Sequence, residues 1–167
     1  MSRRQQVLAL AIGAALVVGI APTGGADGPF QFHSLTPCRL VDTRNAALTV
    51  GNYGPILTSG TARIFPVQGN CGVPVGAKAA TLNVTAVAPT NQGRFTLYPQ
   101  GIAAPLVSTI NFPPGTTALA NGAIVPLSTG GACPSGYTPA TCDLAVMPFV
   151  VGTGQVHLVL DVTGYFQ

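Results

Sequence analysis

The sequence predicts an all-β protein: an antiparallel β-sandwich or jelly roll of about nine short strands, preceded by an N-terminal signal helix. Three observations favour this fold class. After Ile20, apolar and polar residues alternate in short runs without a sustained helical period. Gly and Pro, with 21 and 15 of the 167 residues, separate these runs. Only 7% of the residues are charged and none is glutamate, which disfavours long surface helices and coiled coils.

Residues 1–26 are typical of a secretory signal peptide. Two arginines, Arg3 and Arg4, precede the uncharged apolar run Val7–Ile20. As a helix this run would reach about 21 Å, less than the roughly 30 Å of a bilayer's hydrocarbon core. Small residues then lead to a cleavage site before Asp27. We expect cleavage there, so that the protein meets the membrane only through this segment and residues 27–167 form a single β-sandwich domain. An uncleaved anchor is the alternative.

Nine segments of the mature chain are predicted to be strands, because each combines β-branched or aromatic residues with flanking Gly, Pro or Asn. They are Phe30–Leu35, Arg39–Val41, Arg63–Val67, Ala79–Val87, Arg94–Tyr98, Val107–Phe112, Ala123–Leu127, Leu144–Val151 and Gln155–Phe166. The alternation is clearest in Ala79–Val87 and Gln155–Phe166, where every second side chain should face the core. Pro126 and Pro148 lie inside predicted strands, so we expect edges or bulges at these positions.

All four cysteines lie in the exported part of the chain: Cys38, Cys71, Cys133 and Cys142. An even number in an exported chain favours disulfides, and four cysteines allow three connectivities. We favour Cys133–Cys142, which closes a short loop, and Cys38–Cys71, which ties two early segments together. The alternative is that one pair stays reduced. The disulfides support a secreted location, extracellular or at the cell surface.

Six motifs follow one another along the chain: SLTPCRLVDTR (34–44), GNCGVP (69–74), TLNVTAVAPTNQGRFTLYPQG (81–101), STINFPPG (108–115), ANGAIVPL (120–127) and HLVLDVTGYF (157–166). In this order they resemble a β-rich domain family of exported bacterial proteins, which occurs alone or appended to other domains, sometimes cell-wall enzymes. The resemblance covers most of residues 34–167. It implies a surface-associated or structural module, and it carries over neither a catalytic mechanism nor a site residue.

The candidate site is a polar cluster of Asp42, Arg44, Asn83 and Asp161. Asp42 and Arg44 are two residues apart, which places the carboxylate and the guanidinium on one face of an extended chain. We expect a partly buried Asp–Arg pair, joined by Asn83 or Asp161, that fixes the position of a loop. A ligand-binding cluster is the alternative. A catalytic carboxylate pair would have to be Asp42 and Asp161, an interpretation that we do not favour.

Residues suited to other chemistry are scarce. His157 and Asp161 are four residues apart in a predicted strand, or about 13 Å, which is too far for a catalytic hydrogen bond. The sequence contains no G-x-S-x-G nucleophile motif, no Cys/His zinc pattern and no calcium-loop motif. We therefore expect no catalytic residue, no metal and no cofactor.

The charge balance points away from electrostatic partners. The formal net charge of +3 falls to +1 when Arg3 and Arg4 leave with the signal peptide, since five basic and four acidic residues remain. Nucleic-acid binding is therefore not expected. We expect a non-enzymatic secreted or cell-surface structural protein that self-assembles into oligomers or filaments, because neutral strand faces repel one another little. The alternative is a module that binds cell-wall or extracellular polysaccharide, with Tyr53 and Tyr137 as its exposed aromatic residues.

Overall fold

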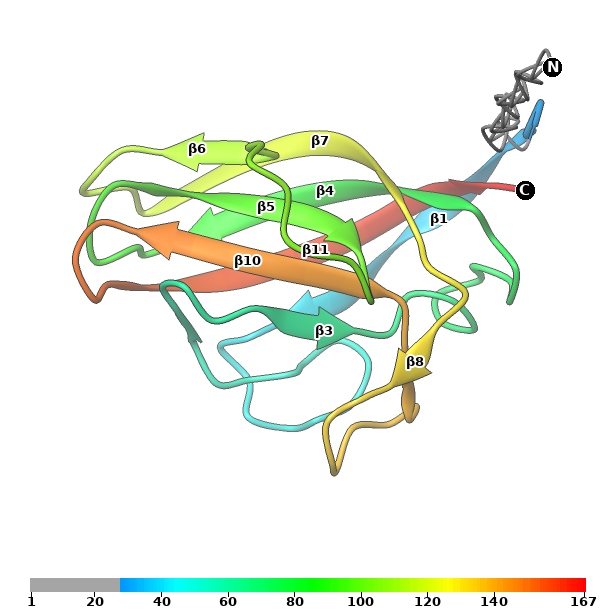
Figure 1. Cartoon of the computed structure of the whole chain (residues 1–167), viewed down its shortest axis with the longest axis horizontal. Helices are drawn as coiled ribbons and strands as arrows, with labels where there is room; N and C mark the ends of the chain where they lie inside the picture. The colour runs from blue at the N-terminus through cyan, green and yellow to red at the C-terminus, as the bar shows by residue number, and fades with distance from the viewer. Residues whose placement is uncertain (1–27) are drawn as a thin grey trace, which may run out of the picture.

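The computed structural model describes residues 28–167, and the predicted signal peptide lies outside this range. The described chain is all-β and contains no helix, which confirms the predicted fold class. Its eleven strands (Figure 1) are β1 (Phe32–Asp42), β2 (Leu57–Thr58), β3 (Arg63–Phe65), β4 (Ala79–Val87), β5 (Gly93–Pro99), β6 (Ile110–Phe112), β7 (Ala118–Pro126), β8 (Gly131–Ala132), β9 (Thr141–Cys142), β10 (Leu144–Val150) and β11 (Gln155–Phe166). Residues 28–167 include no helix long and apolar enough to cross a membrane.

Two antiparallel sheets make up most of the structure. The first sheet has the order β1-β11-β4-β7, with β2 paired to one end of β11, and the second has the order β3-β10-β5-β6. A small hairpin of β8 and β9 is separate from both. The inner faces of the two sheets supply one hydrophobic cluster, whose fully buried members include Val84, Leu158 and Leu160 from the first sheet and Phe95, Leu144 and Val146 from the second.

Strands β4 and β11 confirm the alternation predicted for them. In β4, Ala80, Leu82, Val84 and Ala86 are buried and the residues between them are partly exposed. In β11 the inner row runs from Val156 to Val162 in steps of two. The outer row includes one further buried residue, Val159, which lies opposite Asp42 of β1.

The start of the chain differs from the prediction, because two predicted strands are one. β1 continues from Phe32 to Asp42 and pairs with β11 at both ends, but its register shifts between Ser34 and Cys38 and again between Arg39 and Val41. The second shift adds one residue to β1, so Leu40 and Val41 are both fully buried although they are adjacent. This bulge also decides the direction of the Arg39 side chain.

The two strand prolines lie in different settings. Pro126 ends the edge strand β7, as predicted. Pro148 lies in β10, which is between β3 and β5 in the sheet order, but at Pro148 itself β10 pairs only with β5. β3 reaches only as far as Val146, so no ladder hydrogen bond is lost beside Pro148. The carbonyl of Pro148 instead accepts the backbone N–H of Gly60 at 2.9 Å.

The two ends of the described chain lie side by side (Figure 1). Gln31 and Gln167 exchange two backbone hydrogen bonds, of 2.8 and 3.1 Å. Beyond them, Phe32 pairs with Phe166 and His33 with Tyr165. The first and last strands of the sandwich therefore close on each other at one end of the molecule.

Candidate functional site

Asp42 is the buried centre of the polar cluster, with 4% of its surface exposed. Its carboxylate accepts hydrogen bonds from Nε and Nη2 of Arg44, at 2.8 and 2.6 Å, and from the backbone N–H of Arg44 at 3.1 Å. The Arg44 hydrogen bond holds the pKa of Asp42 below its ordinary value, although burial acts in the opposite direction. The carboxylate is therefore ionised and occupied by its partner, which suits a structural role better than that of a general base.

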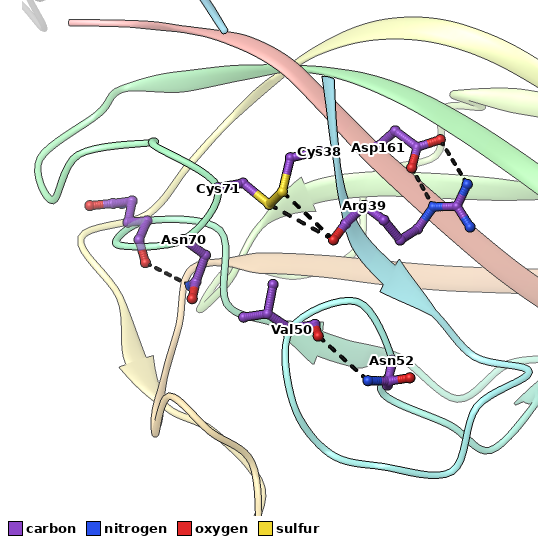
Figure 2. Close-up of a disulfide and its surroundings, with 8 residues drawn as sticks. Cys38, Arg39, Val50, Asn52, Asn70, Cys71 and Asp161 are labelled. Carbon is purple, nitrogen blue, oxygen red and sulfur yellow. Dashed lines mark hydrogen bonds and ion pairs between the residues drawn. A yellow bond between two sulfur atoms is a disulfide. The ribbon is translucent and has the colours of Figure 1, made fainter. Parts of the chain in front are cut away.

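Arg39 joins Asp42 to Asp161, and sequence reasoning missed it. Nη1 of Arg39 lies 3.2 Å from Oδ2 of Asp42, while Nε and Nη2 bind the two carboxylate oxygens of Asp161 (Figure 2). Two arginines and two aspartates thus form a neutral network on the outer face of the first sheet. The available signal was the three-residue spacing of Arg39 and Asp42, which places them together only in a bulged strand.

The remaining candidates lie beside this network. Asn83 is the cross-strand neighbour of Asp161, but its side chain makes no hydrogen bond to the network within residues 28–167. Nδ1 of His157 lies 3.2 Å from Oγ1 of Thr43, and the same Oγ1 accepts the backbone N–H of Leu158 at 2.9 Å. His157 thus has a threonine as its partner rather than Asp161. Across the described residues, no three His, Cys, Asp or Glu side chains are grouped so as to hold a metal ion.

The four cysteines form the two pairs that the sequence favoured. Cys38 is bonded to Cys71, with 5.7 Å between the Cα atoms, and Cys133 to Cys142, with 5.1 Å. The first disulfide ties β1 to the connection between β3 and β4, and both sulfurs lie within 3.9 Å of the carbonyl oxygen of Arg39 (Figure 2). Disulfides form in oxidising compartments, so both bonds are consistent with an extracellular location.

Tyr53 and Tyr137 correct the expectation of exposed aromatic rings in loops. Tyr53 is fully buried and Tyr137 is 9% exposed. Their rings stack with centroids 5.0 Å apart, and the Tyr53 hydroxyl donates to the Thr138 carbonyl at 2.7 Å. The guanidinium of Arg63 donates to the Tyr137 hydroxyl at 2.9 Å and to the carbonyl of Tyr53. These rings hold the long loop that follows β1, and they cannot form a sugar-binding platform.

Asp143 is a buried carboxylate between β9 and β10. It is 1% exposed and accepts the backbone N–H groups of Val67, at 3.0 Å, and of Gln68, at 2.8 Å. Burial raises its pKa to about 6, and the two backbone hydrogen bonds oppose that rise. The side chain positions the chain after β3 and is out of reach of a substrate.

β7 presents the long open edge of the first sheet. Leu127 donates its backbone N–H to Lys78, and Ala88 donates to Thr117, which identifies the odd-numbered residues of β7 as those bonded to β4. The even-numbered residues therefore direct their backbone groups away from β4. In residues 28–167 these groups make no other backbone hydrogen bond. They belong to Ala118, Ala120, Gly122 and Ile124, and all four residues are exposed.

The other sheet edges are shorter or are covered over part of their length. The end of β1 is covered by the following loop, because Gly51 donates to Leu40 at 2.9 Å and Asp42 donates to Asn52 at 2.7 Å. β3 and β6 have three residues each. β7 has nine residues, none charged, and only its last is a proline. Long, uncharged open edges are the strand edges that pair with other chains.

No protein-family model, curated protein or solved structure matches the chain.

Proposed function

We propose that the protein is a non-enzymatic, secreted or cell-surface structural protein that self-associates through the open edge of β7. The observation that carries the proposal is the row of free backbone N–H and C=O groups at Ala118, Ala120, Gly122 and Ile124. Such a row is completed by another extended chain. The side chains on it are small or apolar, so a second copy can approach without charge repulsion or a steric barrier.

The pattern of these groups favours one antiparallel register between two copies. Pairing Ala118 with Ile124 of the second copy, and Ala120 with Gly122 of the second copy, uses every free N–H of the edge. It also leaves Pro126, which has no N–H, outside the ladder. A two-fold axis then passes beside Asn121, whose side chain is already bonded to the carbonyl of Thr109 at 2.8 Å. This pairing is self-complementary and closes as a dimer.

The location of the proposed assembly follows from the cysteines and the N-terminal segment. Both disulfides suit an oxidising exterior. The basic and apolar start of the sequence supports export. An exported protein with few charges and an open strand edge suits a structural role more than catalysis, because the carboxylates of the described chain are occupied by arginines or backbone amides.

The test compares the edge with the neighbouring strand. Ala120→Pro removes an outward N–H, and Ala120→Lys places a charge on the edge, so both variants should shift the protein from dimer to monomer in light scattering. Thr85→Lys is the matched control, because Thr85 lies directly opposite Ala120 on β4 and on the same face. It adds the same charge away from the edge and should leave the dimer intact.

Two results would contradict the proposal. One is a wild-type protein that stays monomeric over a wide concentration range. The other is equal dissociation by Thr85→Lys and Ala120→Lys, which would assign the contact to the sheet face rather than to the edge. Filaments instead of dimers in negative-stain images would reject the two-fold register, since an open polymer needs two different surfaces.

A further inference from the structure

A row of three side chains crosses the outer face of the second sheet. Phe149 of β10 is the register partner of Arg94 of β5, which in turn is the partner of Asn111 of β6. The guanidinium carbon of Arg94 lies 4.6 Å from the centroid of the Phe149 ring. The ring is 46% exposed. We call these three residues the Arg94 row.

The Arg94 row lines a shallow hollow of about 370 Å³, a volume at the lower end of those found for small-ligand sites. Gly93, which also lines the hollow, allows the backbone of β5 to lie close to β10. A Cβ atom at Gly93 would lie 2.1 Å from the carbonyl oxygen of Phe149. Next to the Arg94 row, Thr96 of β5 is buried, because the β5–β6 connection crosses β5 (Figure 1) and the carbonyl of Val107 accepts a hydrogen bond from the Thr96 hydroxyl.

The charges of the described chain leave Arg94 without an anionic partner. Its three aspartates are engaged elsewhere: Asp42 and Asp161 bind arginines, and Asp143 binds backbone amides. Arg63 is satisfied by carbonyl groups. Within residues 28–167, Arg94 and Lys78 are the two cationic side chains with neither a hydrogen bond nor an ion pair.

Of these two cations, Arg94 alone is held in a defined geometry. A guanidinium stacked on an aromatic face keeps its N–H donors at the edge of the stack, where a planar carboxylate can bind two of them. Because the ring already restricts the side chain, less conformational entropy is lost when a ligand binds. Lys78 has no such support from an aromatic ring.

We propose that the Arg94 row binds the carboxylate of a uronic acid unit in a polysaccharide. Arg94 would hold the carboxylate, and Phe149 and Val151 would contact the C–H groups of the sugar ring. The amides of Asn111 and Gln92, which also line the hollow, suit sugar hydroxyls. This combination favours an acidic sugar over an acidic peptide. The site is on the opposite sheet from β7 and does not depend on the proposed self-association.

The test is a calorimetric and NMR titration of the protein with hexagalacturonate, using its fully methyl-esterified form as the uncharged probe. The acid should bind and the ester should not. Arg94→Gln should weaken binding at least about tenfold, the effect of losing one strong charge-assisted contact. Arg94→Lys should also weaken it, because lysine cannot form the planar fork. Phe149→Ala should weaken it by removing the ring.

Lys78→Gln is the matched control, since it removes the same charge from the other unpaired cation and should leave the affinity unchanged. Equal losses in Arg94→Gln and Lys78→Gln would overturn the proposal in favour of nonspecific attraction. Failure of the wild-type protein to bind at millimolar concentrations would overturn it as well. Equal affinity for hexaglutamate would reject the sugar in favour of a peptide carboxylate. Absence of sugar binding would not affect the proposed self-association through β7, because that proposal is tested by the oligomeric state.

Discussion

Arg39 and Asp161 lie directly opposite each other on β1 and β11, and the Arg39 guanidinium binds both carboxylate oxygens of Asp161 while it also reaches Asp42. The Arg39 side chain thus connects the edge strand β1, including its buried last residue Asp42, to the central strand β11. The network is neutral, and its contacts join β1 to β11.

Arg39→Gln should lower the free energy of unfolding by about 1 kcal/mol, because the pairs that it breaks are partly exposed to solvent. Asp42→Ala should cost more, about 2–3 kcal/mol, since it removes the acceptor shared by two arginines from a buried position. Urea unfolding measures both effects. Lys78→Gln, with no ion pair to lose, should stay within about 0.5 kcal/mol of wild type. A cost for Arg39→Gln no larger than for this control would show that the network contributes nothing.

Asp143 should make stability fall as the pH rises from about 4 to about 6. Its pKa is raised from 3.8 to about 6 by burial, so the folded protein binds the proton more tightly than the unfolded chain does. The total loss in the free energy of unfolding is roughly 3 kcal/mol, because each unit of difference between the folded and unfolded pKa corresponds to about 1.4 kcal/mol. Asp42 acts in the opposite direction, because its lowered pKa removes stability only as the pH falls below its ordinary range.

Asp143→Asn separates these two contributions. Urea unfolding at pH 4, 5, 6 and 7 should give a declining stability for wild type and a flat profile for Asp143→Asn over the same interval. The absolute stability of the variant will be lower, since asparagine offers one acceptor oxygen to the two backbone amides. The difference in slope is therefore the informative quantity. Identical slopes would mean that Asp143 keeps its ordinary pKa in the fold.

The two disulfides should contribute unequally to stability. Cys38 and Cys71 are separated by 33 residues and Cys133 and Cys142 by 9, so the first bond restricts the unfolded chain more. Loop entropy predicts costs of about 3.5 and about 2.5 kcal/mol for the respective double serine variants. Urea midpoints measure the two costs. Equal midpoints, or free thiols in denatured wild-type protein without reductant, would contradict the prediction.

Gly164 should tolerate alanine poorly, whereas Gly122 should accept it. A Cβ atom at Gly164 would lie 2.5 Å from the ring of Phe32 and 2.7 Å from the carbonyl oxygen of His33. At Gly122 nothing lies within 4 Å. Gly164→Ala should therefore cost about 1–3 kcal/mol through overpacking, and Gly122→Ala should be neutral or slightly stabilising. Thermal melting compares the two. Equal shifts would show that the β1–β11 contact adapts without cost.

Much of the fold was predictable from residues whose burial repeats every two positions. β4 and β11 have inner rows such as Ala80–Ala86 and Val156–Val162, and the sequence predicted both correctly. β7 was predicted to begin only at Ala123, since the preceding Ala-Leu-Ala-Asn-Gly lacks β-branched residues. Pairing with β4 extends the strand back to Ala118, a contribution of the fold that no local pattern contains.

The candidate site was predictable only in its local part. Asp42 and Arg44 are close in sequence, so their pairing followed from extended geometry. Arg39 was missed because a bulge determines which way it points, and Tyr53 and Tyr137 were misplaced because the loops that contain them fold inward onto each other. Bulges and buried loops depend on tertiary contacts, which cannot be predicted from the sequence pattern of a single strand.

Because Gln31 and Gln167 are hydrogen-bonded to each other, the described chain enters and leaves the sandwich at the same place. A module with adjacent ends can be inserted into a loop of a host protein without forcing the host's flanking segments apart. It can also be circularly permuted by a short peptide joining the two ends. A protein fused to either of these ends would be attached at one end of the sandwich. The turns at the other end of the sandwich would then lie farthest from the point of attachment.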